Sequence, residues 1–294
     1  MILTEKGRLS NMGDILSGLE VFGLKNLDRM DVYGDENAEK PQKESRKTEP
    51  VKPLETDTIF EKGYECPCCD HQFREKTVRT GKMRMISQDI DLRPRYDVGD
   101  TLKYGVVVCP LCGYAALVRS FMHLSPAQSK IIHEKVSQSF TGINLEAETY
   151  SYDDAIARHK LALACAVLKR SEVSERAYLC LMIAWLLRVK AEQFKVSSEE
   201  TRLKREAMKE EEQALLAKAA DGLKEAFTRE HFPMCGLDES TATYLVAALS
   251  FETGKYDEAG IWVSKILTNR TVNNRIKDKA RTLKDTINEM KGQK

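Results

Sequence analysis

The sequence predicts a mainly α-helical protein. A small β-containing, zinc-ribbon-like module precedes a tetratricopeptide-like domain of helical hairpins, and the N-terminal segment is flexible. Three observations predict this fold class. Two Cys-x-x-Cys pairs lie in a segment rich in turn residues, apolar residues recur at helical spacing through the second half, and a short motif occurs twice at expected helix starts. The 294 residues suffice for such an arrangement.

The composition limits the classes of function. Hydrophobic residues make up 42% and charged residues 31%, which is typical of a globular protein with a charged surface. The net charge of +1 argues against bulk electrostatic binding to nucleic acid or to an anionic membrane. The longest apolar run, residues 178–187, is about half the length of a membrane span. Since residues 1–6 lack a basic region followed by an apolar core, we expect no signal peptide, no membrane association and a cytoplasmic location.

The N-terminal part divides in two. Residues 1–33 carry a modest apolar pattern that predicts a short amphipathic helix, although glycines weaken it. Residues 34–57 contain three prolines, many Lys and Glu residues and no aromatic residue. Because such a composition cannot bury a core, we expect a disordered charged linker there.

Residues 58–123 form the predicted metal-binding module. Cys66 and Cys69 make one pair and Cys109 and Cys112 the other, and a β-rich run at residues 104–108 leads directly into the second pair. Two such pairs supply the four thiolates of a tetrahedral zinc site, and a site closed by four cysteines has a structural role by default. The gap of 39 residues between the pairs exceeds the roughly 15–20 residues of compact ribbons, so an insertion must be accommodated.

Two neighbouring residues leave alternatives open. Cys68 is a candidate alternative ligand or an oxidisable thiol, and His71 is a candidate replacement for a cysteine. Both are more simply bystanders, because Cys66 and Cys69 repeat the spacing of the second pair. Thioredoxin-like chemistry would need a βαβ setting, which the flanking sequence does not predict.

A basic segment between the cysteine pairs allows a second hypothesis. Arg93, Arg95 and Tyr96 are candidates for nucleic-acid contact, with the tyrosine as a stacking platform. The other interpretation is a solvated loop with local ion pairs, which the neutral net charge of the chain favours.

Residues 124–294 are predicted to be helical. Ser125 before Pro126 is typical of a helix start, and the charged residues 199–212 open a long helix whose charges we expect to be solvated. In the last helix, apolar residues recur at steps of four and three from Ile276 to Met290, with Asn273 or Asn274 as the cap. That apolar stripe is expected to be core.

A repeated motif suggests stacked helical hairpins. Tyr152-x-x-Ala155 recurs as Tyr256-x-x-Ala259, 104 residues later, which is close to three periods of about 34 residues. In the second copy we expect Asp257 to cap the helix, the tyrosine to cover the turn and the small alanine to allow close packing. A bundle in which such a turn arose by chance is the alternative.

These motifs together resemble a bacterial family known only as domain of unknown function number 2225. The resemblance covers roughly residues 59–290, and it is carried by residues 64–69, 82–84, 89–96 and 107–116 and by the Tyr256-x-x-Ala259 hairpin. The family pattern implies that Cys66, Cys69, Cys109 and Cys112 are the paired positions and that Cys68 falls at a variable one. It implies no activity.

The sequence contains no phosphate-binding glycine loop, no HExxH and no GxSxG motif, so we expect a protein that is not an enzyme. The favoured function is a cytoplasmic protein–protein interaction scaffold with a structural zinc site, which binds an unknown protein or peptide through its helices. The alternatives are a nucleic-acid-binding protein that uses the zinc module, and a thiol or zinc redox sensor.

Overall fold

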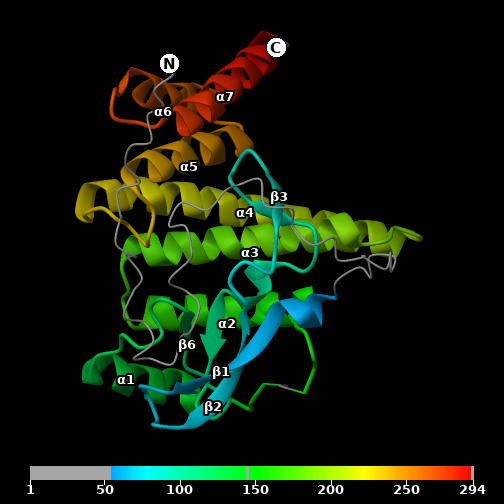
Figure 1. Ribbon diagram of the computed structural model, residues 1–294, viewed down its shortest axis with the longest axis vertical. Helices are drawn as coiled ribbons and strands as arrows, with labels where there is room; N and C mark the ends of the chain where they lie inside the picture. The colour runs from blue at the N-terminus through cyan, green and yellow to red at the C-terminus, as the bar shows by residue number, and fades with distance from the viewer. Residues whose placement is uncertain (1–53, 144–145, 293–294) are drawn as a thin grey trace, which may run out of the picture. The chain divides into compact units, whose positions relative to one another are not determined.

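The computed structural model describes residues 54–143 and 146–292 (Figure 1). Within these residues, three two-stranded antiparallel sheets and seven α-helices are present, which confirms the mainly α-helical fold class. The predicted N-terminal helix and most of the predicted linker lie outside the described residues. The end of that linker differs from the prediction, because Glu55–Thr58 form a 3-10 helix, η2.

The two cysteine pairs lie in equivalent places, each in a loop that joins two paired strands. Strand β1 (Ile59–Glu65) pairs with β2 (Gln72–Val78), and β5 (Val106–Val108) pairs with β6 (Ala115–Leu117). In both cases the loop between the last paired residues has six residues. The strands differ in environment, because every residue of β5 and β6 is buried whereas β1 is mostly exposed.

The long gap between the cysteine pairs is filled by an inserted hairpin. Strands β3 (Met85–Gln88) and β4 (Pro94–Tyr96) pair with one irregularity, and the 3-10 helix η3 (Thr101–Tyr104) follows. Asp100 caps η3 by accepting a hydrogen bond from the backbone N–H of Leu102. The insertion predicted from the cysteine spacing is therefore a folded element.

The helices follow one another as successive layers (Figure 1). From α2 to α7, each helix packs chiefly against the helices that precede and follow it in sequence, and α2 also contacts β5 and β6. Their bounds are α1 Pro126–Ile132 with a following π-helical turn at His133–Ser137, α2 Tyr152–Leu168, α3 Val173–Gln193, α4 Glu199–Arg229, α5 Glu239–Glu252, α6 Tyr256–Thr268 and α7 Asn274–Gly292.

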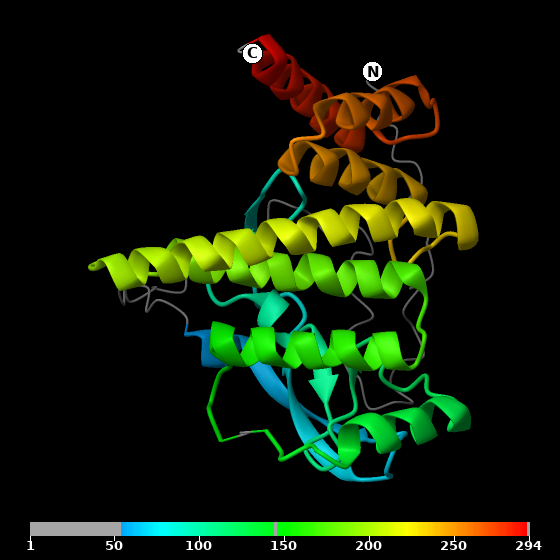
Figure 2. The same ribbon diagram turned by 180° about the vertical axis from the view of Figure 1, so that it is seen from behind.

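The predicted helix ends agree with the structure at two places. Ser125 caps α1 with Pro126 in its first turn, and the side chain of Asn273 accepts a hydrogen bond from the N–H of Ile276 at the start of α7. The charged start of α4 extends past the end of α3, as Figure 2 shows from behind. Most of its charged side chains are exposed, and Glu212 is an exception because it is buried.

Both copies of the repeated motif begin a helix, α2 at Tyr152 and α6 at Tyr256. Ala155 and Ala259 are fully buried, as expected for close helix packing. The predicted cap is wrong, because the N-cap of α6 is Lys255, and Asp257 lies inside the first turn.

The cysteine loops and the helices share one hydrophobic core. A single cluster of buried residues runs from the cysteines through β5, β6 and α2 to α3, α4 and α5, and a second cluster joins α5, α6 and α7. The apolar stripe of α7 is buried at Ile276, Ala280, Leu283 and Ile287, but the prediction is wrong at Met290, which is 37% exposed. The described residues of the cysteine loops and of the helices belong to one compact unit. Among the described helices, none combines the length and the apolar character that a membrane crossing requires.

Candidate metal centre

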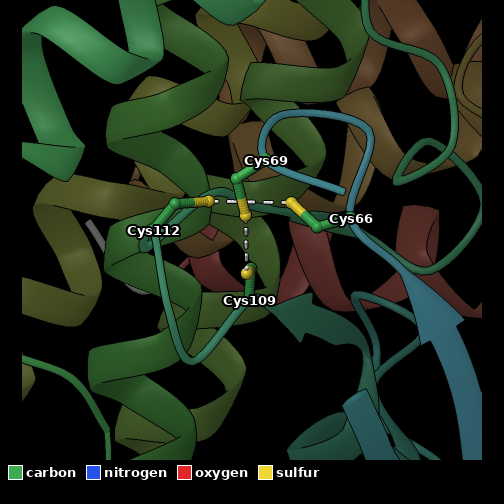
Figure 3. A group of neighbouring side chains, drawn as sticks. All are labelled: Cys66, Cys69, Cys109 and Cys112. Carbon is green, nitrogen blue, oxygen red and sulfur yellow. Dashed lines mark hydrogen bonds between the residues drawn. The ribbon is translucent and has the colours of Figure 1, made fainter. Parts of the chain in front are cut away.

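The four paired cysteines meet at one point (Figure 3). Their sulfur atoms all lie within 4.8 Å of one another, with 3.6 Å between Cys66 and Cys112 and 3.7 Å between Cys69 and Cys109. Four sulfurs placed tetrahedrally about 2.3 Å from a zinc ion would lie about 3.8 Å apart. The donor set and its spacing therefore fit a four-coordinate metal ion of zinc size. Cys69 is half-buried, and the other three cysteines are buried.

The two loops position their cysteines with the same backbone geometry. In the first loop the N–H of Asp70 donates to the carbonyl of Cys66 at 2.9 Å, and in the second loop the N–H of Gly113 donates to the carbonyl of Cys109 at 3.0 Å. The fifth residue of each loop has left-handed backbone, with φ of 58° at Asp70 and 73° at Gly113. Aspartate and glycine are among the residues that adopt this conformation at low cost. Each loop therefore turns back so that its two sulfurs face the same point.

Close contacts among the sulfurs perturb their protonation. Hydrogen bonds from Cys112 and Cys66 lower the pKa of the Cys109 thiol, and backbone N–H groups of the same loop act in the same direction. The hydrogen bonds with Cys109 raise the pKa values of Cys112 and Cys66. The N–H of Cys68 also lies 3.4 Å from the sulfur of Cys66. Because metal ions bind the thiolate, a bound cation would replace the protons that these sulfurs share.

Cys68 and His71 lie outside the group of four sulfurs. The sulfur of Cys68 is 3.8 Å from the carbonyl oxygen of Ser129 in α1, and the Ser129 hydroxyl donates to the Cys68 carbonyl at 3.3 Å. The ring of His71 stacks on Phe73, with ring centroids 6.2 Å apart. Both side chains have packing partners of their own.

The structure pairs the candidate nucleic-acid residues with other protein groups. Arg93 is 1% exposed, and its guanidinium donates to Asp89 at 2.5 Å and to Glu192 at 2.8 Å. Arg95 pairs with the same two carboxylates. The hydroxyl of Tyr96 accepts a hydrogen bond from Thr101 at 2.9 Å. A nucleic-acid phosphate would have to displace these carboxylates to reach Arg93, whereas the side chain of Arg95 is 43% exposed.

Sequence reasoning missed the ionic network that fixes the inserted hairpin to the helices. Asp91, which is fully buried, accepts a hydrogen bond from Trp185 Nε1 at 2.8 Å and pairs with Arg188 at 3.0 Å. Arg188 also donates to Glu212 of α4 at 2.6 Å. The partners are about 90 or more residues from the hairpin. The two aspartates and two arginines of the hairpin, at positions 89, 91, 93 and 95, were visible in the sequence, but nothing local identified their partners.

A second buried ion pair supports the cysteine loops. Glu75 of β2 is 1% exposed, and it accepts hydrogen bonds from Arg158 of α2 and from the hydroxyl of Tyr150. The N–H of Val108, next to Cys109, lies 3.5 Å from the same carboxylate. Glu75 therefore links the exposed pair of strands to the second cysteine loop and to α2.

No curated protein and no solved structure matches this chain. One protein family matches it over residues 59–287, a range that includes both cysteine loops, the inserted hairpin and nearly all of the helices. The chain thus belongs to the family described as uncharacterized protein conserved in bacteria, DUF2225.

Proposed function

We propose that this protein is a cytoplasmic, non-catalytic zinc-binding protein whose helices bind another protein or a peptide. The observation that carries the proposal is the group of four cysteine sulfurs, largely buried and within 4.8 Å of one another. Four thiolates fill all positions of a tetrahedral zinc ion and leave none for water or substrate, which supports a structural role.

The ligand set supports zinc as the bound metal. Soft thiolate ligands in a tetrahedral arrangement favour zinc or iron–sulfur chemistry over magnesium or calcium, and a lone four-cysteine site formed by two Cys-x-x-Cys loops is typical of structural zinc. The ion would tie the first loop, which follows the exposed strand β1, to the second loop in the core. Its binding energy would then be part of the folding energy of the module.

Two cavities beside the helices support the interaction role. The larger is about 610 Å³ and lies between α3, the start of α5 and the inserted hairpin. The smaller is about 440 Å³ and is lined by residues of α4, α5 and α6, with Phe227 and Trp262 among them. Both volumes lie in the range of ligand-binding sites. A stack of helices presents such surfaces to extended partners.

Metal analysis tests the zinc assignment. We expect protein purified without added metal to hold one zinc per chain by elemental analysis and native mass spectrometry. Cys112→Ser should lose or weaken this zinc, whereas Cys180→Ser should keep it, because Cys180 lies on α3 outside the group. Cys68→Ser, in the first loop itself, should also keep it. Folded wild-type protein without metal would contradict the proposal.

Site-specific photocrosslinking tests the interaction role. A crosslinking side chain in place of Thr241 lines the larger cavity, and one in place of Thr243 lines the smaller. We expect at least one of these positions to capture a defined partner in bacterial cells. The matched control is Lys209, which is exposed on the charged part of α4. Equal capture from all three positions would indicate non-specific contact and would contradict the proposed binding surface.

A further inference from the structure

The larger cavity lies where three parts of the fold meet. Its walls come from the inserted hairpin, from the segment around β6 and η3, from α3 and from the start of α5. The lining is mostly apolar and aromatic. Representative lining residues are Met85, Tyr96, Leu117, Met182, Trp185 and Leu245. An apolar cavity of about 610 Å³ with a few polar groups is typical of a binding site for part of an organic ligand.

Arg119 is the one residue with a formal charge among the described residues that line this cavity. Its guanidinium lies 5.1 Å from the centre of the Tyr178 ring and donates to the carbonyl of Cys235. Cys235 and Gly236 both have left-handed backbone, with φ of 46° and 77°, and a Cβ at Gly236 would collide with Arg119 Nη1. The turn before α5 therefore leaves room for this guanidinium, and the Arg119 side chain is exposed.

No carboxylate in the described part of the chain lies within ion-pair distance of Arg119. This distinguishes it from Arg93, Arg95 and Arg188, which are paired with carboxylates. A guanidinium has five N–H donors, so one bond to Cys235 leaves donors for an oxyanion. Arginine and carboxylate groups form strong charge-assisted hydrogen bonds. The apolar lining and the positive charge of Arg119 therefore suit a ligand that contains both an apolar group and a carboxylate.

Strand β3 favours a peptide as the source of that carboxylate. Met85 and Gln88, at the two ends of β3, both line the cavity. The sheet of β3 and β4 has two strands, so each strand has one edge without a partner strand in the sheet. An extended peptide can form backbone hydrogen bonds to such an edge while its side chains enter pockets.

We propose that this cavity binds the C-terminal residues of a protein or peptide that ends in an apolar side chain, with the terminal carboxylate on Arg119. The proposal specifies the peptide binding proposed above and rests on it. The apolar side chain lies against Met182 and Trp185, and the peptide backbone runs along β3. Arg119 supplies the specificity for a free carboxyl end.

Trp185 provides a direct readout. The chain has two tryptophans, Trp185 and Trp262, so Trp262→Phe in the full-length protein leaves only the one that lines this cavity. The probe is acetyl-Leu-Leu-Phe with a free carboxylate, compared with the same peptide as its C-terminal amide. We expect the acid to change the Trp185 emission saturably and the amide to bind about 10-fold or more weakly, because it cannot form the charge-assisted pair. Chemical shifts of the Met85 and Met182 methyl groups should follow the same titration.

Two variants and one small acid complete the test. Arg119→Gln should abolish the preference for the acid, whereas Arg229→Gln, which removes an exposed arginine on α4, should leave it unchanged. Equal affinity for acid and amide in the wild type would overturn the proposal, as would the absence of a saturable response. Binding of 4-phenylbutyrate as tight as that of the peptide would also overturn it, in favour of a free organic acid. None of these results affects zinc content or crosslinking at Thr243, so this inference can fail while the proposed function stands.

Discussion

The two cysteine loops have the same backbone geometry but very different surroundings. The first loop connects β1, which is mostly exposed, to β2, and the second connects β5 and β6, in which every residue is buried. Gly113 in the second loop is buried, whereas Asp70 at the equivalent position in the first loop is exposed. The hydrophobic core therefore supports the second loop directly.

Because their surroundings differ, the two cysteine loops depend to different degrees on a bound metal ion. Apolar burial stabilises the second loop without a metal ion, in proportion to the surface removed from water. The first loop is held by the sulfur group, by the contact between Cys68 and Ser129 and by the buried side chains of β2. A metal ion would thus contribute most of its stabilising energy to the first loop. Four predictions follow from this contrast, in order of decreasing effect.

Metal removal should affect the two loops unequally. We expect a chelator to accelerate amide hydrogen exchange at Cys66 and Asp70 far more than at Cys109 and Gly113, because the core retains the second loop. The N–H groups of these four residues donate to backbone carbonyls at the loops, which makes them comparable reporters. Hydrogen exchange followed by mass spectrometry or NMR checks this. Equal acceleration of exchange in both loops would contradict the view that the metal ion stabilises mainly the first loop.

The Glu75→Ala variant should distinguish the contribution of the buried ion pair to stability from that of the metal ion. It leaves Arg158, which is 4% exposed, without its carboxylate, and breaking a buried pair costs about 3–5 kcal/mol. We expect the free energy of unfolding, measured in urea, to fall by this amount. The variant should still bind one zinc per chain. Glu61→Ala on the neighbouring strand is the control, because it breaks an exposed pair with Arg74 and should cost less than about 1 kcal/mol. Loss of zinc in folded Glu75→Ala protein would indicate that the ion pair positions the sulfurs.

Alanine substitutions at the two left-handed positions, Asp70 and Gly113, should lower the free energy of unfolding by different amounts. At Gly113 a Cβ would lie 2.6 Å from the ring of Phe140, and left-handed backbone adds about 1–2 kcal/mol for a residue with a Cβ. Asp70 already carries a Cβ in this conformation at an exposed site, so Asp70→Ala should cost less than about 1 kcal/mol. Thermal and urea unfolding measure both. Equal costs would show that the two loops have equivalent surroundings after all.

The third residues of the two loops give the smallest contrast. Cys68 is half-buried against Ser129, whereas Leu111 is 61% exposed. We expect Leu111→Ala to change the unfolding free energy by no more than about 0.5 kcal/mol and Cys68→Ala to cost somewhat more, although leucine is the larger apolar residue. A larger cost for Leu111→Ala would indicate that a partner or a segment outside the described residues covers this side chain.

Local sequence signals predicted much of the fold. The Ser125 cap, the Asn273 cap and the buried stripe of α7 depend on residues within one or two helical turns, and all three are present. The end of the linker differs because Glu55 pairs with Lys103 and Tyr104, nearly 50 residues away. No composition argument could have found that contact.

The sulfur group was visible in the cysteine spacing, whereas the surrounding ionic groups were not. The spacing of two Cys-x-x-Cys pairs is enough to predict that they bind one metal ion. No spacing rule predicts the ion-pair partner of a carboxylate such as Asp91 or Glu75. Arg93 illustrates the difference. It resembled a candidate nucleic-acid contact in the sequence, and it is buried between Asp89 and Glu192. Ion pairs formed in the folded protein decide whether a basic residue is available to bind nucleic acid.

X-ray absorption at the zinc edge of the purified protein tests the central claim most directly, because it reports the ligands of the bound ion. Four thiolates from two loops predict four sulfur neighbours at about 2.3 Å and no nitrogen or oxygen neighbour. Cys68→Ser should give the same spectrum, since its sulfur is outside the group of four. A mixed shell of sulfur and nitrogen, or a spectrum that changes in Cys68→Ser, would contradict the four-cysteine centre.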